Sequence, residues 1–121
     1  MSRDFRSIKA WERAHALTLD IYKATADFPK HELYGLTSQI RRATASIPIN
    51  IAEGCGRSSL AELNRFMDYA SGSSTELEYE LLLAHDLGHL RRDRYLPLTT
   101  EVVEIRRMMV AFARKLKVDR D

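Results

Sequence analysis

The 121-residue chain has 45% hydrophobic and 30% charged residues, a composition typical of one globular domain, here residues 1–121. Five glycines and three prolines are too few for a β-sandwich or a disordered chain, and the single cysteine, Cys55, excludes an internal disulfide framework and a cysteine-based zinc site. The net charge is only +2, and no apolar run is long enough for a membrane span or a signal peptide, so a cytoplasmic protein is expected.

The first predicted helix covers residues 8–27 and carries apolar residues at steps of three and four, the spacing of one helix face. These residues are Ala10, Ala14, Leu17, Ile21, Ala24 and Phe28. Ser7 is a candidate N-cap, because its hydroxyl can accept a hydrogen bond from a first-turn amide, and Pro29 ends the helix. Further apolar residues lie off this stripe, so we expect more than one neighbouring helix.

The second predicted helix covers residues 37–54, with Leu36 as an alternative first residue. Its core stripe consists of Leu36, Ile40, Thr44, Ile47 and Ile51. Pro48 lies inside the helix and removes one backbone hydrogen bond. The helix is therefore expected to kink near Thr44, or to divide into two shorter helices that meet at Ser46–Pro48.

The third predicted helix covers residues 60–90 and begins with a capping box of Ser59 and Glu62, in which each side chain bonds a backbone amide of the other. Its core stripe consists of Leu63, Phe66, Ala70, Ser73 or Ser74, Leu77, Leu81, Ala84 and Gly88. The small residues Ser71–Ser74 interrupt this stripe. They are expected where another backbone approaches closely.

The fourth predicted helix covers residues 97–117, with Pro97 in the first turn, where its missing N–H is not needed. Its stripe consists of Leu98, Val102, Ile105, Met109, Phe112 and Leu116. Four long helices with short loops predict an all-α fold, an antiparallel up-and-down four-helix bundle.

A second, polar stripe follows the helix over residues 37–54. It consists of Gln39, Arg42, Ser46, Asn50, Glu53 and Arg57. Glu53 has the helical ion-pair spacing to Arg57, with Arg42 as the alternative partner. We interpret these residues as a structural or intersubunit network rather than as a contact with phosphate. The network candidates are Gln39, Ser46, Asn50, Glu53, Arg57 and Glu76.

Arginine makes up fourteen of the nineteen basic residues, and its planar guanidinium suits both phosphate and carboxylate groups. The candidate contacts with nucleic acid or a partner are Arg41, Arg42, Arg57, Arg91, Arg92, Arg94, Arg106 and Arg107. The net charges of residues 1–35, 36–61, 62–90 and 91–121 are +1, +2, −5 and +4. This alternation also fits internal or intersubunit ion pairs.

Residues suited to catalysis or metal binding are few. His85 and His89 have a spacing that can hold a metal on a helix, but no third ligand is evident, and we expect a solvent-facing pair. Cys55 lies near a helix C-terminus, which disfavours a reactive thiolate, and Gly54–Gly56 are expected to stop the helix with a left-handed glycine. We predict no catalytic residue, cofactor, metal or small-molecule substrate.

Several motifs together resemble one family. Residues 39–54 read QIRRATASIPINIAEG, Arg57 follows them, and residues 70–78 read ASGSSTELE. The other matching positions are Trp11, Ile21–Tyr22, Phe28–Pro29, Glu32 and Tyr34–Leu36. Over roughly residues 5–118 the chain resembles the four-helix-bundle family named for the open reading frame in intervening sequences of bacterial 23S rRNA genes.

The resemblance implies a closed four-helix bundle that assembles into a ring-shaped homopentamer and has no established enzymatic activity. A distant relative binds nucleic acid and a reverse transcriptase, so the resemblance also implies RNA or DNA binding. We therefore expect a bacterial, non-enzymatic, self-assembling protein that binds RNA or DNA through arginine-rich surfaces of the oligomer. The alternative is a protein-interaction scaffold with no nucleic-acid role.

Overall fold

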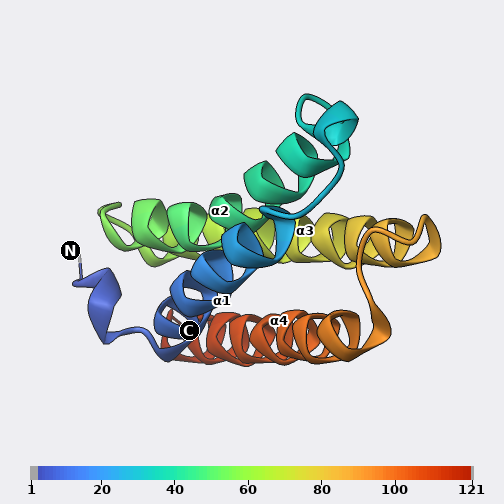
Figure 1. Cartoon of the computed structure of the whole chain (residues 1–121). Helices are drawn as coiled ribbons and strands as arrows, with labels where there is room; N and C mark the ends of the chain where they lie inside the picture. Colours follow the sequence, from blue (N-terminus) through green and yellow to red (C-terminus); the bar gives the residue numbers. More distant parts are fainter. Residues whose placement is uncertain (1–2, 121) are drawn as a thin grey trace.

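The computed structural model describes residues 3–120, which form four α-helices and two single-turn 3₁₀ helices (Figure 1). The α-helices are α1 (Lys9–Thr25), α2 (Leu36–Cys55), α3 (Leu60–Asp86) and α4 (Arg92–Arg120). The 3₁₀ helices are η1 (Phe5–Ser7) and η2 (Lys30–Glu32). The described residues contain no strand, so the predicted all-α class is confirmed.

Consecutive helices run in opposite directions, as the colour order in Figure 1 shows, and this is the predicted up-and-down bundle. α2 and α3 form the most extensive interface, α3 also packs on α4, and α1 packs on both α2 and α4. Within residues 3–120, no Cα atom of α1 lies within 8 Å of one in α3, and none of α2 lies within 8 Å of one in α4. These two pairs are therefore the diagonals of the bundle, and the junctions α1–α2 and α3–α4 lie on opposite sides.

The predicted apolar stripes fill the core. The largest fully buried apolar side chains are Leu17, Ile21, Ile40, Ile47, Ile51, Met67, Leu77, Leu81, Val102, Ile105 and Met109. Phe66 and Phe112 are only partly buried and lie at the edge of this core. Fully burying one such side chain contributes about 1.5–3 kcal/mol, so this layer holds the four helices together. No helix within residues 3–120 combines the length and the apolar character needed to cross a membrane.

Pro48 lies inside α2 without dividing it, because the helix is continuous from Leu36 to Cys55. The alternative of two shorter helices is therefore wrong. Figure 1 shows that α2 bends part-way along its length, as a helix with an interior proline is expected to do. The hydroxyl of Thr44 donates to the carbonyl of Ile40 at 2.7 Å, a bond that also favours bending.

α3 ends at Asp86, before the predicted residue 90, because Gly88 caps it. Gly88 has a φ of 81°, in the left-handed region that glycine adopts without strain. The amide of His89 donates to the carbonyl of Ala84 at 2.9 Å. The amide of Gly88 donates to the carbonyl of His85 at 3.0 Å, which completes a Schellman motif. His89 therefore lies beyond the helix, and Gly88 is not part of its core stripe.

α4 begins at Arg92 rather than at the predicted residue 97. The carbonyl of Arg91 already accepts a hydrogen bond from the amide of Tyr95 at 2.8 Å. Pro97 thus lies in the second turn, and its predicted place in the first turn is wrong. The helix tolerates it because the residue is exposed and only one backbone hydrogen bond is lost.

The glycines of α2 and α3 differ from their predicted roles. A Cβ at Gly54 would lie 2.9 Å from the Cβ of Phe66, so this glycine permits the close approach of α2 and α3. Gly56 follows α2 with a φ of −80°, so the predicted left-handed stop at residues 54–56 is wrong. Outside the neighbouring backbone of α3 itself, no heavy atom of residues 3–120 lies within 4 Å of a Cβ built at Gly72, so the predicted close backbone approach does not occur there.

One of the two predicted N-caps is confirmed, although the second bond of its capping box, from the Ser59 amide to the Glu62 carboxylate, is not found among residues 3–120. The Ser59 hydroxyl accepts a hydrogen bond from the amide of Glu62 at 3.1 Å. The Ser7 prediction is wrong, because its hydroxyl donates to the carbonyl of Asp4 at 2.7 Å and belongs to η1. α1 instead begins after Ile8, which provides no side-chain cap.

Candidate functional site

Part of the predicted polar stripe of α2 faces α3. The α2–α3 seam consists of Arg42, Ser46, Asn50, Ser73, Glu76 and Glu80. The hydroxyls of Ser46 and Ser73 lie 2.6 Å apart, and the Asn50 amide donates to the Ser46 carbonyl at 2.8 Å and to its hydroxyl at 3.0 Å. Three members of the seam thus form a hydrogen-bonded network that joins two helices of one chain.

Glu80 is the most deeply buried member of the seam. Its side chain is 5% exposed, and its Oε1 has no hydrogen-bond partner among the described residues. Burial raises the pKa of Glu80 to about 7, and the hydrogen bond to Glu76 and the charge of that residue add to the rise, whereas the charge of Arg42 opposes it. The seam therefore holds an additional proton close to neutral pH.

The remaining residues of the polar stripe lie outside the seam. Gln39 is exposed. Glu53 pairs with Arg57 at 3.3 Å, and both side chains are about half exposed. The guanidinium of Arg57 also lies over the ring of Phe66, 4.8 Å from its centroid. The six residues thus do not form one continuous network, because the bend and the end of α2 turn some of them toward solvent.

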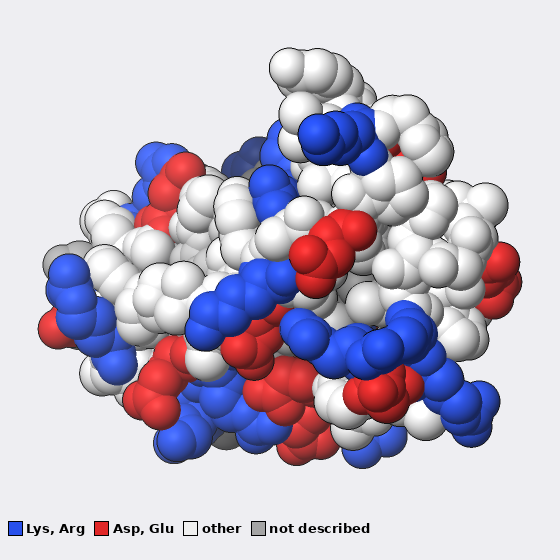
Figure 2. All heavy atoms as spheres, in the orientation of Figure 1, with Lys and Arg blue, Asp and Glu red and all other residues white. Residues whose placement is uncertain are grey.

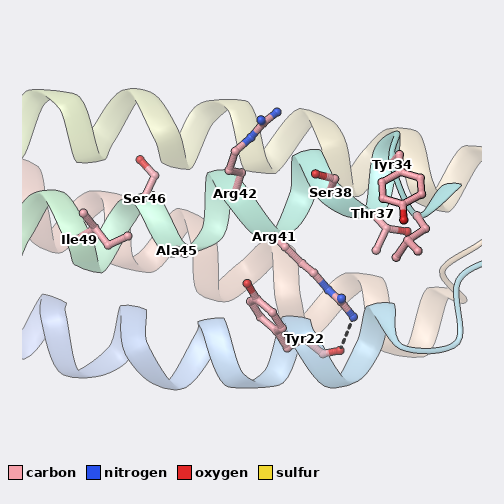
Figure 3. A pocket seen from close by; sticks show the side chains of 10 residues that line it. Tyr22, Tyr34, Thr37, Ser38, Arg41, Arg42, Ala45, Ser46 and Ile49 are labelled. Atoms are coloured by element: carbon pink, nitrogen blue, oxygen red, sulfur yellow. Dashed lines mark hydrogen bonds between the residues drawn. The ribbon is translucent and has the colours of Figure 1, made fainter.

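Arg41 and Arg42 are neighbours in sequence but point to different helices, as Figure 3 shows. Arg41 donates to the hydroxyl of Thr25 at 2.9 Å and to the carbonyl of Tyr22 at 3.3 Å. Its guanidinium also lies 4.8 Å from the centroid of the Tyr22 ring. Arg41 therefore joins α2 to α1, whereas Arg42 points toward α3.

The arginines of α4 and of the loop before it fall into two groups. Arg106 pairs with Glu78 at 2.5 Å, Arg107 with Glu104 at 3.8 Å, and Arg91 with Asp93 at 3.4 Å. Arg92 and Arg94 are exposed in the first turn of α4. Most of the candidate arginines therefore have an acidic or aromatic partner within the chain.

Charged side chains are unevenly distributed over the surface in Figure 2. Basic and acidic side chains alternate over the lower part of this face, and fewer charged side chains occur on its upper part. An open groove of 580 Å³, the α1–α2 groove, lies between α1 and α2, and its lining includes two basic side chains. Its lining residues are Tyr22, Leu33, Tyr34, Thr37, Ser38, Arg41, Arg42, Ala45, Ser46 and Ile49 (Figure 3).

Large side chains in and beside the α1–α2 groove are unusually exposed. Tyr34 is 94% exposed and Ile49 is 55% exposed. A second hollow of 330 Å³, the α3–α4 hollow, lies on the opposite side of the bundle and is lined by Thr75, Glu78, Tyr79, Leu82 and Tyr95. Tyr79 is 62% exposed. Exposed apolar side chains thus occur on two separate surfaces of the bundle.

The two connecting loops at one end of the bundle meet through His31, Glu32 and His89, the loop cluster. The Nε2 atom of His89 lies 2.9 Å from Oε2 of Glu32. This hydrogen bond lowers the pKa of Glu32 below its usual value, and the charges of the two histidines act in the same direction. The loop cluster thus joins η2 to the segment after α3.

The prediction of a solvent-facing His85 and His89 pair is wrong. Because the Schellman motif ends α3, His85 and His89 no longer lie on one helix face. The Nδ1 atom of His85 lies 2.8 Å from the Leu90 carbonyl, and its ring stacks on Tyr95. The side chain of His89 is only 13% exposed. The glycine at position 88 was the sequence signal that could have revealed this arrangement.

Sequence reasoning also missed the partners of these histidines. His31 and Glu32 are separated from His89 by more than fifty residues, and no periodicity connects them. Glu80 was missed for a different reason, because a charged residue among apolar ones is ordinarily expected at a helix surface. Burial raises the pKa of the Cys55 thiol, which agrees with the prediction that it is unreactive.

Residues 6–111 match the model of the family described as 23S rRNA-intervening sequence protein. The chain belongs to this family. The match covers all four helices except the last part of α4, so it includes the seam, the groove, the hollow and the loop cluster.

A solved structure with the same fold comes from Bacteroides thetaiotaomicron and is described as a protein with unknown function from the S23 ribosomal protein family. It is 21% identical to this member of the 23S rRNA-intervening sequence family and has a TM-score of 0.78. The similarity covers 86% of this chain and 97% of that chain. The comparison with curated proteins found no match. Neither description names an enzymatic activity.

Proposed function

We propose that this chain is a non-enzymatic protein that assembles with copies of itself into a ring, a homopentamer, and that the ring binds RNA. The observation that carries the assembly is the pair of different surfaces on opposite sides of the bundle, the α1–α2 groove and the α3–α4 hollow. A contact between two different surfaces is head-to-tail, and such contacts build a ring when the rotation closes. The number of subunits follows from the family resemblance.

The chemistry of the two surfaces supports a second copy of the chain as the occupant of the α1–α2 groove. The groove contains the cationic side chains Arg41 and Arg42 among apolar and hydroxyl groups. The α3–α4 hollow presents Tyr79 beside the carboxylate of Glu78, which also pairs with Arg106, on a helix whose segment 62–90 has a net charge of −5. An aromatic side chain can fill an apolar groove, and acidic neighbours are complementary in charge to the arginines that line it.

A measurement of the mass in solution tests the assembly. We expect light scattering after size-exclusion chromatography to give a pentamer for the unaltered chain, and smaller species for Ile49→Glu and for Tyr79→Glu. Leu87→Glu is the matched control, because Leu87 is 53% exposed and lies outside both surfaces. A monomeric unaltered chain would exclude the ring, and a pentamer that persists in both variants would exclude these two surfaces.

RNA binding is the part of the proposal that rests on exposed arginines. Arg92 and Arg94 lie in the first turn of α4, and this pair would occur once in each of the five subunits of the ring. Repeated phosphate contacts raise avidity, so a chain with a net charge of only +2 can form a particle that binds a polyanion. The family description, which names the 23S rRNA-intervening sequence, agrees with RNA as the polyanion.

Anisotropy of a labelled 23S rRNA fragment tests this part. We expect binding at low salt that weakens steeply as salt rises, and a shallower salt dependence for the double variant Arg92→Gln with Arg94→Gln. The double variant Lys9→Gln with Lys23→Gln, on α1, removes the same charge elsewhere and is the control. A ring that binds no RNA at low salt would favour the alternative function, a protein-interaction scaffold that uses the same grooves.

A further inference from the structure

The loop cluster brings three groups that bind metal ions to one place. His31 and Glu32 come from η2, and His89 comes from the segment directly after α3. One ligand atom of each residue, a ring nitrogen or a carboxylate oxygen, lies within 4.8 Å of the corresponding atoms of the other two. The two loops lie at the same end of the bundle because α1 and α3 run in the same direction.

Two of the three groups are already held in place. Oε1 of Glu32 accepts a hydrogen bond from the amide of Leu36 at 3.4 Å, which orients the carboxylate and leaves Oε2 for His89 at 2.9 Å. The ring of Phe28 packs beside the ring of His89, with 5.7 Å between centroids. A carboxylate with one oxygen bound to the backbone and the other beside an imidazole nitrogen is oriented as metal-ligating carboxylates often are.

We propose that His31, Glu32 and His89 bind a divalent transition-metal cation of the Zn²⁺ class. Two imidazole nitrogens and one carboxylate oxygen form a three-ligand zinc site, and a water or a small anion would occupy the fourth position. The nitrogen ligands disfavour Ca²⁺ and Mg²⁺, which bind through oxygen.

The rearrangement needed for binding is small. Metal–ligand bonds of about 2.0–2.2 Å in a tetrahedral site place neighbouring ligand atoms about 3.3–3.5 Å apart. His89 and Glu32 would therefore separate by about half an ångström, since the metal replaces their hydrogen bond. His31 would approach by about 1.5 Å at most, and its side chain is free to do so because it is exposed.

The bound ion would connect the loop before α2 to the loop before α4. Because the ligands lie far apart in sequence, the unfolded chain would not hold them together, and binding to the folded state would raise its stability. The cluster could otherwise be only a hydrogen bond between two loops. That alternative predicts no response to metal, so the two can be distinguished by experiment.

Cobalt replaces zinc in such sites and gives an intense visible absorption in tetrahedral coordination, so Co²⁺ is the probe. The experiment titrates CoCl₂ into the full chain without a polyhistidine tag, and then adds ZnCl₂. We expect a visible band that saturates at one Co²⁺ per chain and disappears on addition of Zn²⁺. ZnCl₂ should also raise the thermal unfolding midpoint, which is measured by circular dichroism.

Variants identify the ligands. His89→Gln keeps a donor for Glu32 but removes the imidazole, and His31→Gln changes an exposed side chain; both should weaken Zn²⁺ binding at least about tenfold. His15→Gln, on the exposed side of α1, removes one histidine elsewhere and should leave the band unchanged. The absence of a band in the unaltered chain would overturn the proposal. So would a band of unchanged affinity in both His89→Gln and His31→Gln.

Discussion

Glu32 and Glu80 are two shielded glutamates of the same bundle, yet their pKa values move in opposite directions. The Glu32 carboxylate accepts hydrogen bonds from the Leu36 amide and from His89, and its pKa is lowered. Oε1 of the buried Glu80 has no hydrogen-bond partner within the described part of the chain and the carboxylate of Glu76 lies nearby, so the pKa of Glu80 is raised to about 7. Burial acts on both groups in the same direction, so the donors around each group decide the outcome.

The loop cluster and the α2–α3 seam differ in the same way. At the loop cluster, Glu32 and His89 pair with each other and join segments that are distant in sequence. At the α2–α3 seam, the side chains of Ser46, Ser73 and Asn50 bond one another, whereas Oε1 of the buried Glu80 has no hydrogen-bond partner among the described residues. Stability should therefore respond to pH mainly through the seam, and the loop cluster should act locally.

The largest expected effect concerns Glu80 and pH. The folded chain holds the Glu80 proton up to about pH 7, whereas the unfolded chain releases it near pH 4.5. Between these values the unfolded state binds fewer protons, so the free energy of unfolding falls as pH rises, by on the order of 2 kcal/mol. Glu80→Gln should remove most of this dependence, as measured by urea unfolding from pH 5 to pH 8.

Glu12→Gln is the matched control for this measurement, because Glu12 is exposed on α1. It should keep the pH dependence of the unaltered chain. An equal dependence in Glu80→Gln and in the unaltered chain would contradict the assignment of the proton to the seam.

A smaller effect is expected for Ser46→Ala, which removes the hydrogen bonds to Ser73 and Asn50. Leaving half-buried polar groups without a partner should lower the free energy of unfolding by about 1 kcal/mol at any pH. Ser38→Ala, elsewhere in the α1–α2 groove, removes an equivalent hydroxyl and should change stability less. If the two variants unfold alike, the seam network does not contribute to stability.

A local effect is expected for Glu32→Ala. Without the carboxylate, the Leu36 amide and His89 lose a partner, so the first turn of α2 should open more often. Hydrogen exchange in metal-free buffer with EDTA should show faster exchange over residues 30–38. Exchange at Leu77 and Leu81, in the core of α3, should stay unchanged, and faster exchange there would indicate a global rather than a local role.

The smallest effect on unfolding is expected for Glu53→Ala. The ion pair with Arg57 is half exposed, and pairs at this helical spacing contribute about 0.2–0.5 kcal/mol. The change should be detectable by urea unfolding at low salt and should vanish at high salt. A loss above about 1 kcal/mol would mean that Glu53 has a further partner, which in the proposed ring would belong to another subunit.

Sequence patterns predicted much of the fold. Apolar residues that recur every three or four positions identified the four helices, because a helix that buries one face needs apolar side chains at this spacing. The end of α3 and the start of α4 were missed, because Gly88 was counted as a core position and Pro97 as a first-turn residue. Both errors arise where local turn chemistry overrides periodicity.

The candidate site was less predictable. The polar stripe of α2 was visible in sequence, but its division between a seam with α3 and an exposed pair at Glu53 and Arg57 depends on how far apart the helices lie. The arginine groups were visible too, whereas the partners of Arg41 on α1 and of Arg106 on α3 were not. Which side chains of different helices pair depends on how the helices pack. The spacing of residues within one helix does not predict it.

The order of the residues alone determined that four amphipathic helices form, because backbone geometry and the burial of apolar groups act on each segment separately. Folding in three dimensions decided which charges are satisfied. It buried Glu80 beside Glu76 and Arg42 and brought His89 to Glu32. The free energy of a charge depends on all the groups around it, and those groups come together only when the helices pack.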